Sequence, residues 1–234
     1  MAVRGFRGMS FALMPYVVDL DVLNGSVGSK DDKLRRMIGG RFRQHLTHFD
    51  SRFDHLIEDG GPPIYEAIRA VIDGGPFEDK YGVMYNYAFK WICEFHGRLL
   101  ANADFSPMRS GWLEVVDKGL ADLGVTAVRV GDLGMGRAPS PIPISSEGHP
   151  HYGEWTLAEC EKALEQWEQV AEEREAAIDP YVLKAAESSM GWCKTAVTAG
   201  RSGLLPLVSA PTTSSDTTRI TVGRGATGGS CRVA

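Results

Sequence analysis

The chain has 234 residues, of which 43% are hydrophobic and 24% are charged. These proportions are those of an ordinary globular protein, and the length is enough for one domain with a full hydrophobic core. No run of residues approaches the about 18 consecutive apolar residues that a membrane-spanning helix needs, so the sequence does not predict a membrane protein.

The net charge of −5 is unevenly distributed along the chain. Residues 1–8 carry two arginines and no carboxylate, and residues 201–234 carry four arginines and one carboxylate, so the two ends contribute +5. The body between them, residues 9–200, therefore carries −10. Surfaces that bind nucleic acids are basic, so an acidic body argues against nucleic-acid binding and favours a basic protein as the partner.

Two short segments have the pattern of β-strands. Residues 11–18 are apolar and β-branched at their end, and Pro15 within them predicts a strand at the edge of a sheet. Residues 126–130 hold three β-branched side chains, which predicts a second strand.

The stretch from residue 81 to 100 is apolar on most sides. Its large side chains recur at steps of three and four, which is the period of one helix face. They are Tyr81, Met84, Ala88, Trp91, Phe95 and Leu99. A helix this apolar must be covered on most sides, so we expect residues 81–100 to form the central helix of the core. The predicted fold class is therefore α+β: a predominantly helical single domain, residues 9–208, with a small sheet packed on this helix.

Other helices are indicated by their start and stop signals. An apolar stripe runs from Leu34 to Ile57, with the pair Gly39–Gly40 weakening its middle. Residues 64–73 lie between two Gly-Pro segments, and Ser106–Pro107 has the pattern of a helix start. Thr156 with Glu159 forms a capping box, and Asp179–Pro180 begins the last helix. The helix around residues 161–175 is rich in glutamate.

The ends of the chain differ from its body. Met9 is an alternative initiator, in which case residues 1–8 are an extension upstream of the true start. Residues 209–234 are small, polar and rich in Ser, Thr and Gly, so we expect a disordered tail. Pro15 interrupts the N-terminal apolar run, which does not fit a signal peptide. The four cysteines are scattered, as in a cytoplasmic protein with reduced thiols.

Three segments carry a resemblance to a known family. They are L-M-P-Y-V-V-D-L-D at residues 13–21, F-S-P-M at residues 105–108, and G-D-L-G-M-G-R-A-P-S-P-I-P-I at residues 131–144. Together they resemble an uncharacterised family of actinomycete proteins, known only as a domain of unknown function. The resemblance covers about residues 9–200 and implies a single domain. It implies no activity and no site residues.

The strongest candidate site is the loop from residue 132 to 154. It holds three charged residues and two histidines that can face one ligand if the loop is extended. These residues are Asp132, Arg137, His149, His151 and Glu154. Weaker candidates for a metal site are His45, His48 and His55, which would share one side of a continuous helix, but the H-E-x-x-H arrangement is missing. Cys93 with His96 is more readily explained by core packing than by catalysis.

Two functional interpretations remain open at this point. The first is a non-catalytic cytoplasmic interaction protein, of immunity or accessory type, that presents an acidic surface to a basic partner. The second is a small hydrolase or a metal- or ligand-binding enzyme with its site in the 132–154 loop. A deep pocket lined by Arg137, His149 and His151 would favour the second. The sequence carries no cofactor motif, and we expect no cofactor, no nucleic acid and no membrane among its ligands.

Overall fold

The computed structural model describes residues 11–109, 111–134, 136, 138–145, 150–170, 178–200 and 203–209, with the backbone alone described in the last range. The main helices are α1 (Leu20–Ser26), α2 (Asp32–Asp50), α3 (Asp54–Glu58), α4 (Ile64–Asp73), α5 (Gly82–His96), α6 (Trp112–Asp122), α7 (Leu157–Gln169) and α9 (Pro180–Ala199). The strands are β1 (Ala12–Val18), β2 (Arg98–Leu99), β3 (His151–Tyr152), β4 (Trp155–Thr156) and β5 (Gly203–Ser209). Short 3-10 helices lie at η1 (Asp79–Tyr81), η2 (Ala103–Phe105) and η3 (Gly131–Gly134).

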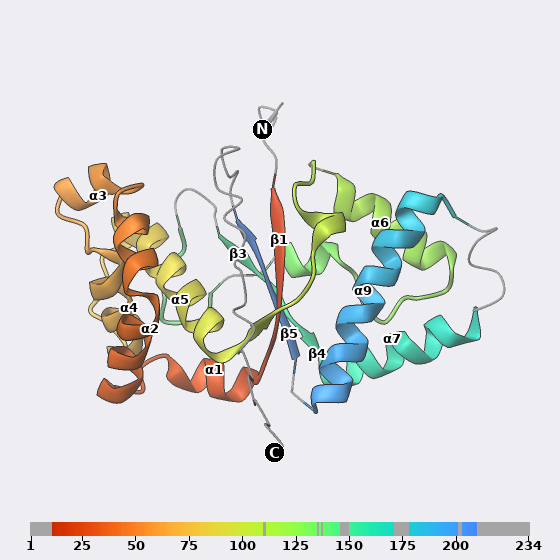
Figure 1. Cartoon of the computed structure of the whole chain (residues 1–234), viewed down its shortest axis with the longest axis horizontal. Helices are drawn as coiled ribbons and strands as arrows, with labels where there is room; N and C mark the ends of the chain where they lie inside the picture. The colour runs from red at the N-terminus through yellow and green to blue at the C-terminus, as the bar shows by residue number, and fades with distance from the viewer. Residues whose placement is uncertain are drawn as a thin grey trace, which may run out of the picture.

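An antiparallel sheet runs through the middle of the molecule (Figure 1). Its order is β2-β1-β5-β3, and β4 also pairs with β5. The longest ladder joins β1 to β5, from Ala12 opposite Ser209 to Val18 opposite Gly203. The first and last strands of the described chain are therefore neighbours, so the domain cannot complete its sheet until β5 has been synthesised.

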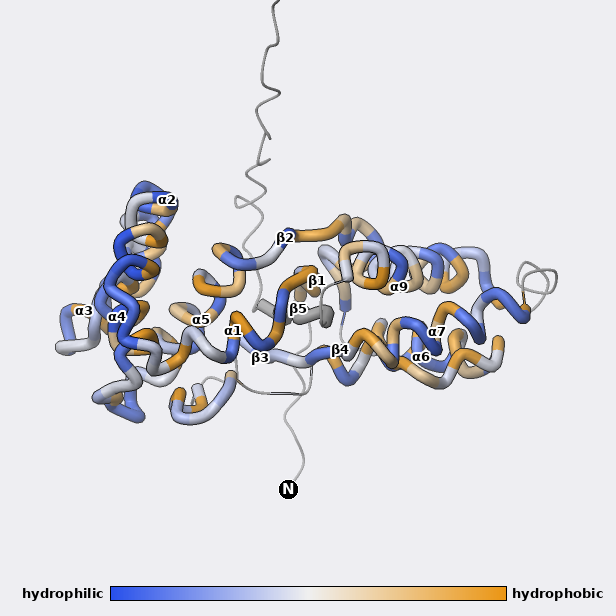
Figure 2. Tube along the Cα trace, turned by 90° about the horizontal axis from the view of Figure 1, so that it is seen from below, coloured by the Kyte–Doolittle hydropathy of each residue, from blue (hydrophilic) through white to orange (hydrophobic). Residues whose placement is uncertain are grey.

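The sheet separates two hydrophobic cores. Helices α1 to α5 lie on one side of it, and α6, α7 and α9 lie on the other, as the two perpendicular views agree (Figures 1 and 2). Successive side chains of a strand point to opposite faces, and β1 follows this rule. Tyr16 and Val18 belong to the first core, whereas Leu13 and Val17 belong to the second. Strand β1 therefore contributes buried side chains to both layers of helices.

The helix-rich α+β class is confirmed, with a different element at its centre. Helix α5 is the most buried of the described helices, with ten of its fifteen residues buried. It ends at His96 instead of residue 100, because Gly97 adopts an extended conformation and Arg98–Leu99 pairs with β1 as β2. The middle layer is the sheet, and α5 belongs to one of the two layers that cover it.

The predicted strand at residues 126–130 is wrong. Val128 and Val130 are buried, but the segment has no partner strand, and side chains accept hydrogen bonds from its backbone instead. The side-chain oxygen of Gln166 accepts hydrogen bonds from the backbone N–H groups of Thr126 and Ala127, both at 3.0 Å. The carboxylate of Asp117 accepts from Val130 N at 2.5 Å. These three backbone donors are satisfied without a β-ladder, which periodicity alone does not reveal.

Strand β1 is an interior strand, although Pro15 predicted an edge. Pro15 lies opposite Pro206 of β5, and its carbonyl oxygen accepts a hydrogen bond from Leu100 N at 2.8 Å on the other side. The N and C=O groups of one strand residue point to the same side, so Pro15 and Pro206 form a non-hydrogen-bonded pair. The missing N–H groups therefore cost no hydrogen bond between β1 and β5.

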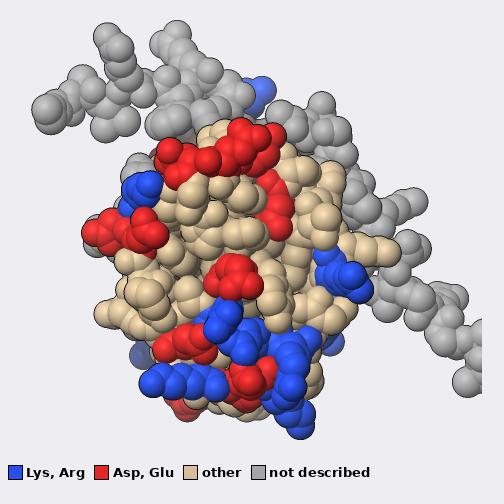
Figure 3. Space-filling model, turned by 90° about the vertical axis from the view of Figure 1, so that its left-hand side faces the viewer, with Lys and Arg blue, Asp and Glu red and all other residues tan. Residues whose placement is uncertain are grey.

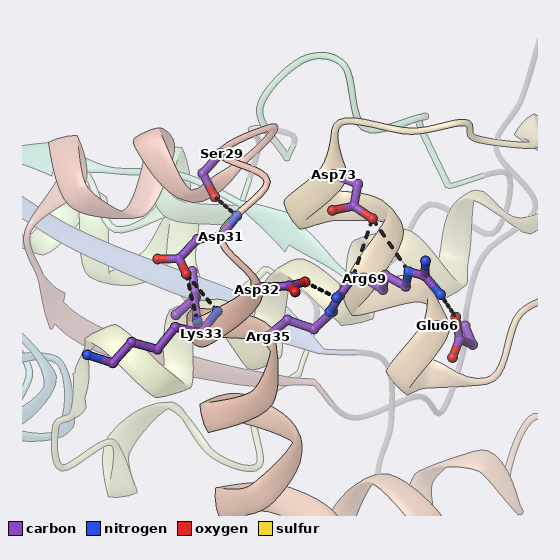
Figure 4. A network of polar contacts seen from close by, with 9 residues as sticks. Ser29, Asp31, Asp32, Lys33, Arg35, Glu66, Arg69 and Asp73 are labelled. Carbon is purple, nitrogen blue, oxygen red and sulfur yellow. Dashed lines mark hydrogen bonds and ion pairs between the residues drawn. The ribbon is translucent and has the colours of Figure 1, made fainter.

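The start of α2 is fixed to α4 by a polar network (Figure 4). Asp31 caps α2 by accepting from Lys33 N at 2.8 Å and from Leu34 N at 3.0 Å. Arg35 forms ion pairs with Asp32 and with Asp73 of α4, the latter at 3.5 Å. The two helices also approach closely at Gly39, where an added Cβ would lie 2.4 Å from the Tyr65 ring.

Two predicted helix boundaries need correction. The helix predicted along the stripe from residue 34 to 57 ends at Asp50. The carboxylate of Asp50 accepts a hydrogen bond from Ile64 N, at the start of α4, at 2.7 Å. Ser106–Pro107 does not begin a helix, because Met108 pairs with Phe11 as an isolated β-bridge and α6 starts only at Trp112. The capping box of Thr156 with Glu159 and the Asp179–Pro180 start are confirmed.

The two ends fall largely outside the described residues. Residues 1–10 and 210–234 are among those left undescribed, so the upstream extension and the disordered tail stay predictions, although Ser209 itself closes β5. Within the described part of the chain, no helix is long and apolar enough to cross a membrane. Cys93, Cys160 and Cys193 are buried free thiols, as expected.

Candidate functional site

The 132–154 loop crosses from η3 to the sheet and is anchored at both ends. Gly136 pairs with Tyr152 of β3 as an antiparallel bridge. Gly153 packs against the backbone of η3, since an added Cβ would lie 2.4 Å from the Asp132 carbonyl oxygen. Only a glycine fits at this contact. Residues 138–145 extend away from these anchors towards the first turns of α5.

A pocket of about 500 Å³ lies between this loop and α5. Its wall combines apolar groups, chiefly the prolines and isoleucines of the loop, with a few polar side chains. The described polar side chains of the wall are Asn86, Ser140, Ser145 and His151. A largely apolar concavity with few polar groups is the usual form of a small-molecule site.

Asn86 holds the loop against α5. Its side-chain Nδ2 donates to Gly82 O and to Pro143 O, both at 2.7 Å, and it is only 4% exposed. Both hydrogens of Nδ2 are then used, which leaves Oδ1 as the remaining hydrogen-bonding atom of this side chain. The burial of this polar side chain is tolerated because the two backbone carbonyls satisfy its amide hydrogens.

The pocket contains one of the predicted site residues that the structure describes. His151 lies in its wall, half-buried in β3, and desolvation by burial lowers the pKa of its imidazole. Asp132 and Glu154 are exposed and do not line the pocket. Arg137 and His149 lie outside the described residues. The sequence missed Asn86 and Ser145, because neither belongs to a motif and only the loop's path brings them together.

The histidines at positions 45, 48 and 55 do not converge. The break after Asp50 places His45 and His48 on α2 and His55 on α3, so the seven-residue spacing no longer puts them on one helix side. The His45 ring lies 6.2 Å from that of Trp91, and His55 Nδ1 lies 3.8 Å from the Asp54 carboxylate. Among the described residues, no group of three His, Cys, Asp or Glu side chains is placed to hold a metal ion.

The serine and cysteine near His96 are not arranged as nucleophiles. Ser26 Oγ donates its hydrogen to Val22 O at 2.8 Å. His96 Nε2 lies 3.1 Å from Ser26 Oγ. Ser26 therefore accepts from His96, the reverse of the direction that a Ser–His nucleophile needs. Burial raises the pKa of the Cys93 thiol well above its ordinary value, which disfavours the reactive thiolate.

A second concave surface, the α6–α9 groove, lies on the opposite side of the sheet. It has a volume of about 610 Å³, and Trp112, Val115 and Tyr181 supply its apolar surface. The Tyr181 side chain is 78% exposed and that of Val115 is 48% exposed. Tyr181 follows Pro180 in the first turn of α9, and the buried stripe of this helix begins at the next residue, Val182. The position of Tyr181 outside this stripe was the signal in the sequence that its side chain is exposed.

The edge of the groove is held rigidly by Asp104. Its backbone oxygen accepts from Trp112 Nε1 at 2.9 Å, and its carboxylate accepts from Ser188 Oγ at 2.5 Å. Lys184 Nζ lies 3.2 Å from the same carboxylate. Asp179 also lines the groove and caps α9.

Comparison with known proteins identifies the family. A model described as a domain of unknown function, DUF7691, matches residues 9–205. The chain belongs to the DUF7691 family. The match spans β1 to the first residues of β5, and it confirms the resemblance to an uncharacterised domain family. No curated protein and no solved structure matches the chain.

Proposed function

We propose that this DUF7691 protein is a non-catalytic cytoplasmic interaction protein that binds a basic protein partner at the α6–α9 groove. The observation that carries the proposal is the exposure of Tyr181, 78%, beside Val115 and Trp112 in a concave surface. Tyrosine and tryptophan are the residues most enriched among those that dominate binding energy at protein interfaces. A partner's apolar side chain that fills the groove would bury all three residues.

The charge around the groove favours a basic partner. Helices α6, α7 and α9, which lie on this side of the sheet, together carry eight carboxylates against four lysines. The opposite end of the molecule differs, since α2 carries five Lys and Arg residues against two carboxylates. Figure 3 shows that end, where Lys and Arg gather on the lower part of the face and carboxylates along its upper rim. The acidic surface is therefore local, and electrostatic attraction would direct a basic partner towards the α6–α7 end.

The surroundings of the candidate nucleophiles support a non-catalytic role. Ser26 donates its hydrogen to a backbone carbonyl, and the Cys93 thiol is buried with a raised pKa. Buried free thiols also support a reducing compartment, because cytoplasmic proteins keep their cysteines reduced. The alternative of a hydrolase rests on the 132–154 loop, of which the described part supplies one histidine to the pocket and no carboxylate.

The test uses the full chain as bait in a lysate of the cells that express it. We expect wild type to retain a basic protein that is released as salt is raised, because salt screens charge attraction. The double variant Val115→Ser with Tyr181→Ser should bind the purified partner at least about tenfold more weakly, equivalent to about 1.4 kcal/mol, by titration calorimetry.

The matched control is the double variant Val22→Ser with Met37→Ser, whose side chains are 51% and 47% exposed on the other helical layer. It should bind the partner as wild type does. Equal losses in the two double variants would show a general effect of surface polarity and contradict the proposal. A wild-type bait that retains no protein would contradict it as well.

A further inference from the structure

We propose that the pocket between α5 and the 132–154 loop binds an uncharged small molecule through an amide or lactam group. The wall of this pocket comes from α5, the loop and β3 and shares no residue with the α6–α9 groove, so this site is independent of the proposed protein partner. The inference starts from the hydrogen-bonding groups of its wall.

The hydroxyl of Ser145 lacks a hydrogen-bond partner. Ser145 is 7% exposed, and its Oγ is buried without a donor or acceptor near enough to bond. Native proteins leave few buried polar groups unpaired, so a buried hydroxyl of this kind calls for a partner such as a water molecule or a ligand. Because Ser145 borders the pocket, rotation about its Cα–Cβ bond is the movement that presents the hydroxyl to a bound molecule.

Asn86 supplies a complementary group nearby. Asn86 lines the pocket and its Nδ2 is fully used by two backbone carbonyls, so Oδ1 is the atom that this side chain can offer to a ligand. One of those carbonyls belongs to Pro143, two residues before Ser145. An amide or lactam has an N–H beside a C=O, so it can donate to Asn86 Oδ1 and accept from the Ser145 hydroxyl at once.

The rest of the wall favours an uncharged ligand. The described lining contains no Lys, Arg, Asp or Glu, and burial lowers the pKa of His151, which favours its neutral imidazole. A charged molecule would lose its hydration without gaining an opposite charge from these described residues. Proline rings and the side chain of Ile142 cover the remaining surface, which suits the apolar body of a ring-shaped amide.

The floor of the pocket is preformed. The loop packs directly on the first turn of α5, since a Cβ on Gly82 would lie 2.6 Å from Ile144 O. Tyr152 OH donates to the backbone oxygen of Asn86 at 2.5 Å and fixes this turn to β3. A ligand that binds here does not need to order these segments, which preserves more of the binding energy as affinity.

The experiment titrates the full chain with benzamide and, separately, with benzoate, its charged counterpart of the same shape. We expect benzamide to bind with a Kd of about 1 mM, a typical affinity for a molecule of this size, and benzoate at least about tenfold more weakly. Backbone amide NMR shifts should move at residues 82–86 for benzamide. Ser145→Ala should weaken benzamide at least about fivefold while leaving the thermal midpoint equal or higher, because it removes an unpaired buried hydroxyl.

Two controls decide the assignment. Ser26→Ala removes a buried hydroxyl outside the pocket and should leave benzamide binding unchanged. The groove variant Val115→Ser with Tyr181→Ser should also bind benzamide normally, which separates this site from the partner surface. Equal binding of benzamide and benzoate, unaltered binding by Ser145→Ala, a lower midpoint in that variant, or no binding at all would each overturn the proposal.

Discussion

Tyr152 donates a hydrogen bond from its hydroxyl to the backbone oxygen of Asn86 at 2.5 Å, across 66 residues of sequence. Its ring also packs edge-on against Phe89, with ring centroids 5.2 Å apart. These contacts join β3 to the most buried helix, and the same turn of α5 carries the Asn86 side chain that holds the loop. The sheet, helix α5 and the pocket loop are thus connected through one residue pair.

Tyr152→Phe should lower the free energy of unfolding by about 1 kcal/mol, the usual net value of one intramolecular hydrogen bond. The ring and its packing against Phe89 remain, so the loss isolates the hydroxyl. Urea denaturation measures it. Tyr181→Phe is the control, since that side chain is 78% exposed and should change stability little. Equal effects in the two variants would show that the Tyr152 hydroxyl does not hold α5.

Asp117→Ala should be more damaging, because two backbone donors lose their acceptor. The carboxylate accepts from Val130 N at 2.5 Å and from Gly131 N at 3.0 Å, and the segment that carries them has no partner strand. Leaving both N–H groups unpaired should cost about 2–3 kcal/mol of unfolding free energy. Asp122→Ala, on the same helix and exposed, removes a surface pair with Lys118 and should cost less than about 1 kcal/mol. Comparable losses would refute this account of residues 126–130.

The adjacent glycines of α2 should respond in opposite directions. At Gly40 an added Cβ meets no atom within 4 Å, so Gly40→Ala should raise the free energy of unfolding by about 0.5–1 kcal/mol through better helix propensity. At Gly39 the Cβ would lie 2.4 Å from the Tyr65 ring, so Gly39→Ala should lower the free energy of unfolding by displacing this ring from its packing on α2. Thermal and urea unfolding of both variants measure the difference. A gain of stability in both would mean that α2 and α4 do not pack closely here.

Stability should fall on mild acidification, in part because of His96. Burial lowers the pKa of this imidazole below the ordinary value of 6.5. Between the folded and unfolded pKa values the unfolded chain binds the proton and the folded chain does not, so unfolding is favoured as pH falls through this window. His96→Gln keeps a donor for Ser26 and does not titrate, so its unfolding free energy should depend less steeply on pH.

Urea titrations between about pH 7.5 and pH 5.5 measure the slope, with exposed His48→Gln as the control. Burial lowers the pKa of His151 in the same way. His151 therefore makes the unfolding free energy fall with falling pH in both variants. A His96→Gln slope as steep as that of His48→Gln would exclude His96 as a source of the acid sensitivity.

The most periodic and best-capped elements of the fold were predictable from local sequence. The apolar period of residues 81–96 gave the most buried helix, and Thr156 with Glu159 gave the start of α7. These features depend on contacts between residues three or four apart, which a linear pattern records. The helix-rich α+β class follows from them.

The site was less predictable. His151 was predicted within the 132–154 loop and lies in the pocket wall, but its neighbours in that wall, Asn86 and Ser145, come from segments about 60 residues apart. Tyr181 and Val115, the exposed side chains of the groove, come from helices that meet only through their packing. Sequence shows which side chains are polar or apolar, but exposure is decided by what covers them.

By itself the sequence determined the most buried helix, the starts of α7 and α9 and the burial of three cysteines, because each rests on short-range geometry or on simple hydrophobicity. The tertiary structure decided that β1 is an interior strand facing two cores, that residues 126–130 are held by Gln166 and Asp117 instead of by a strand, and that Asn86 is buried. Each of these outcomes depends on where a distant backbone donor or acceptor lies. When two hydrogen-bonding groups lie tens of residues apart, no periodic pattern in the sequence shows that they are partners. Only the folded structure shows which donor meets which acceptor.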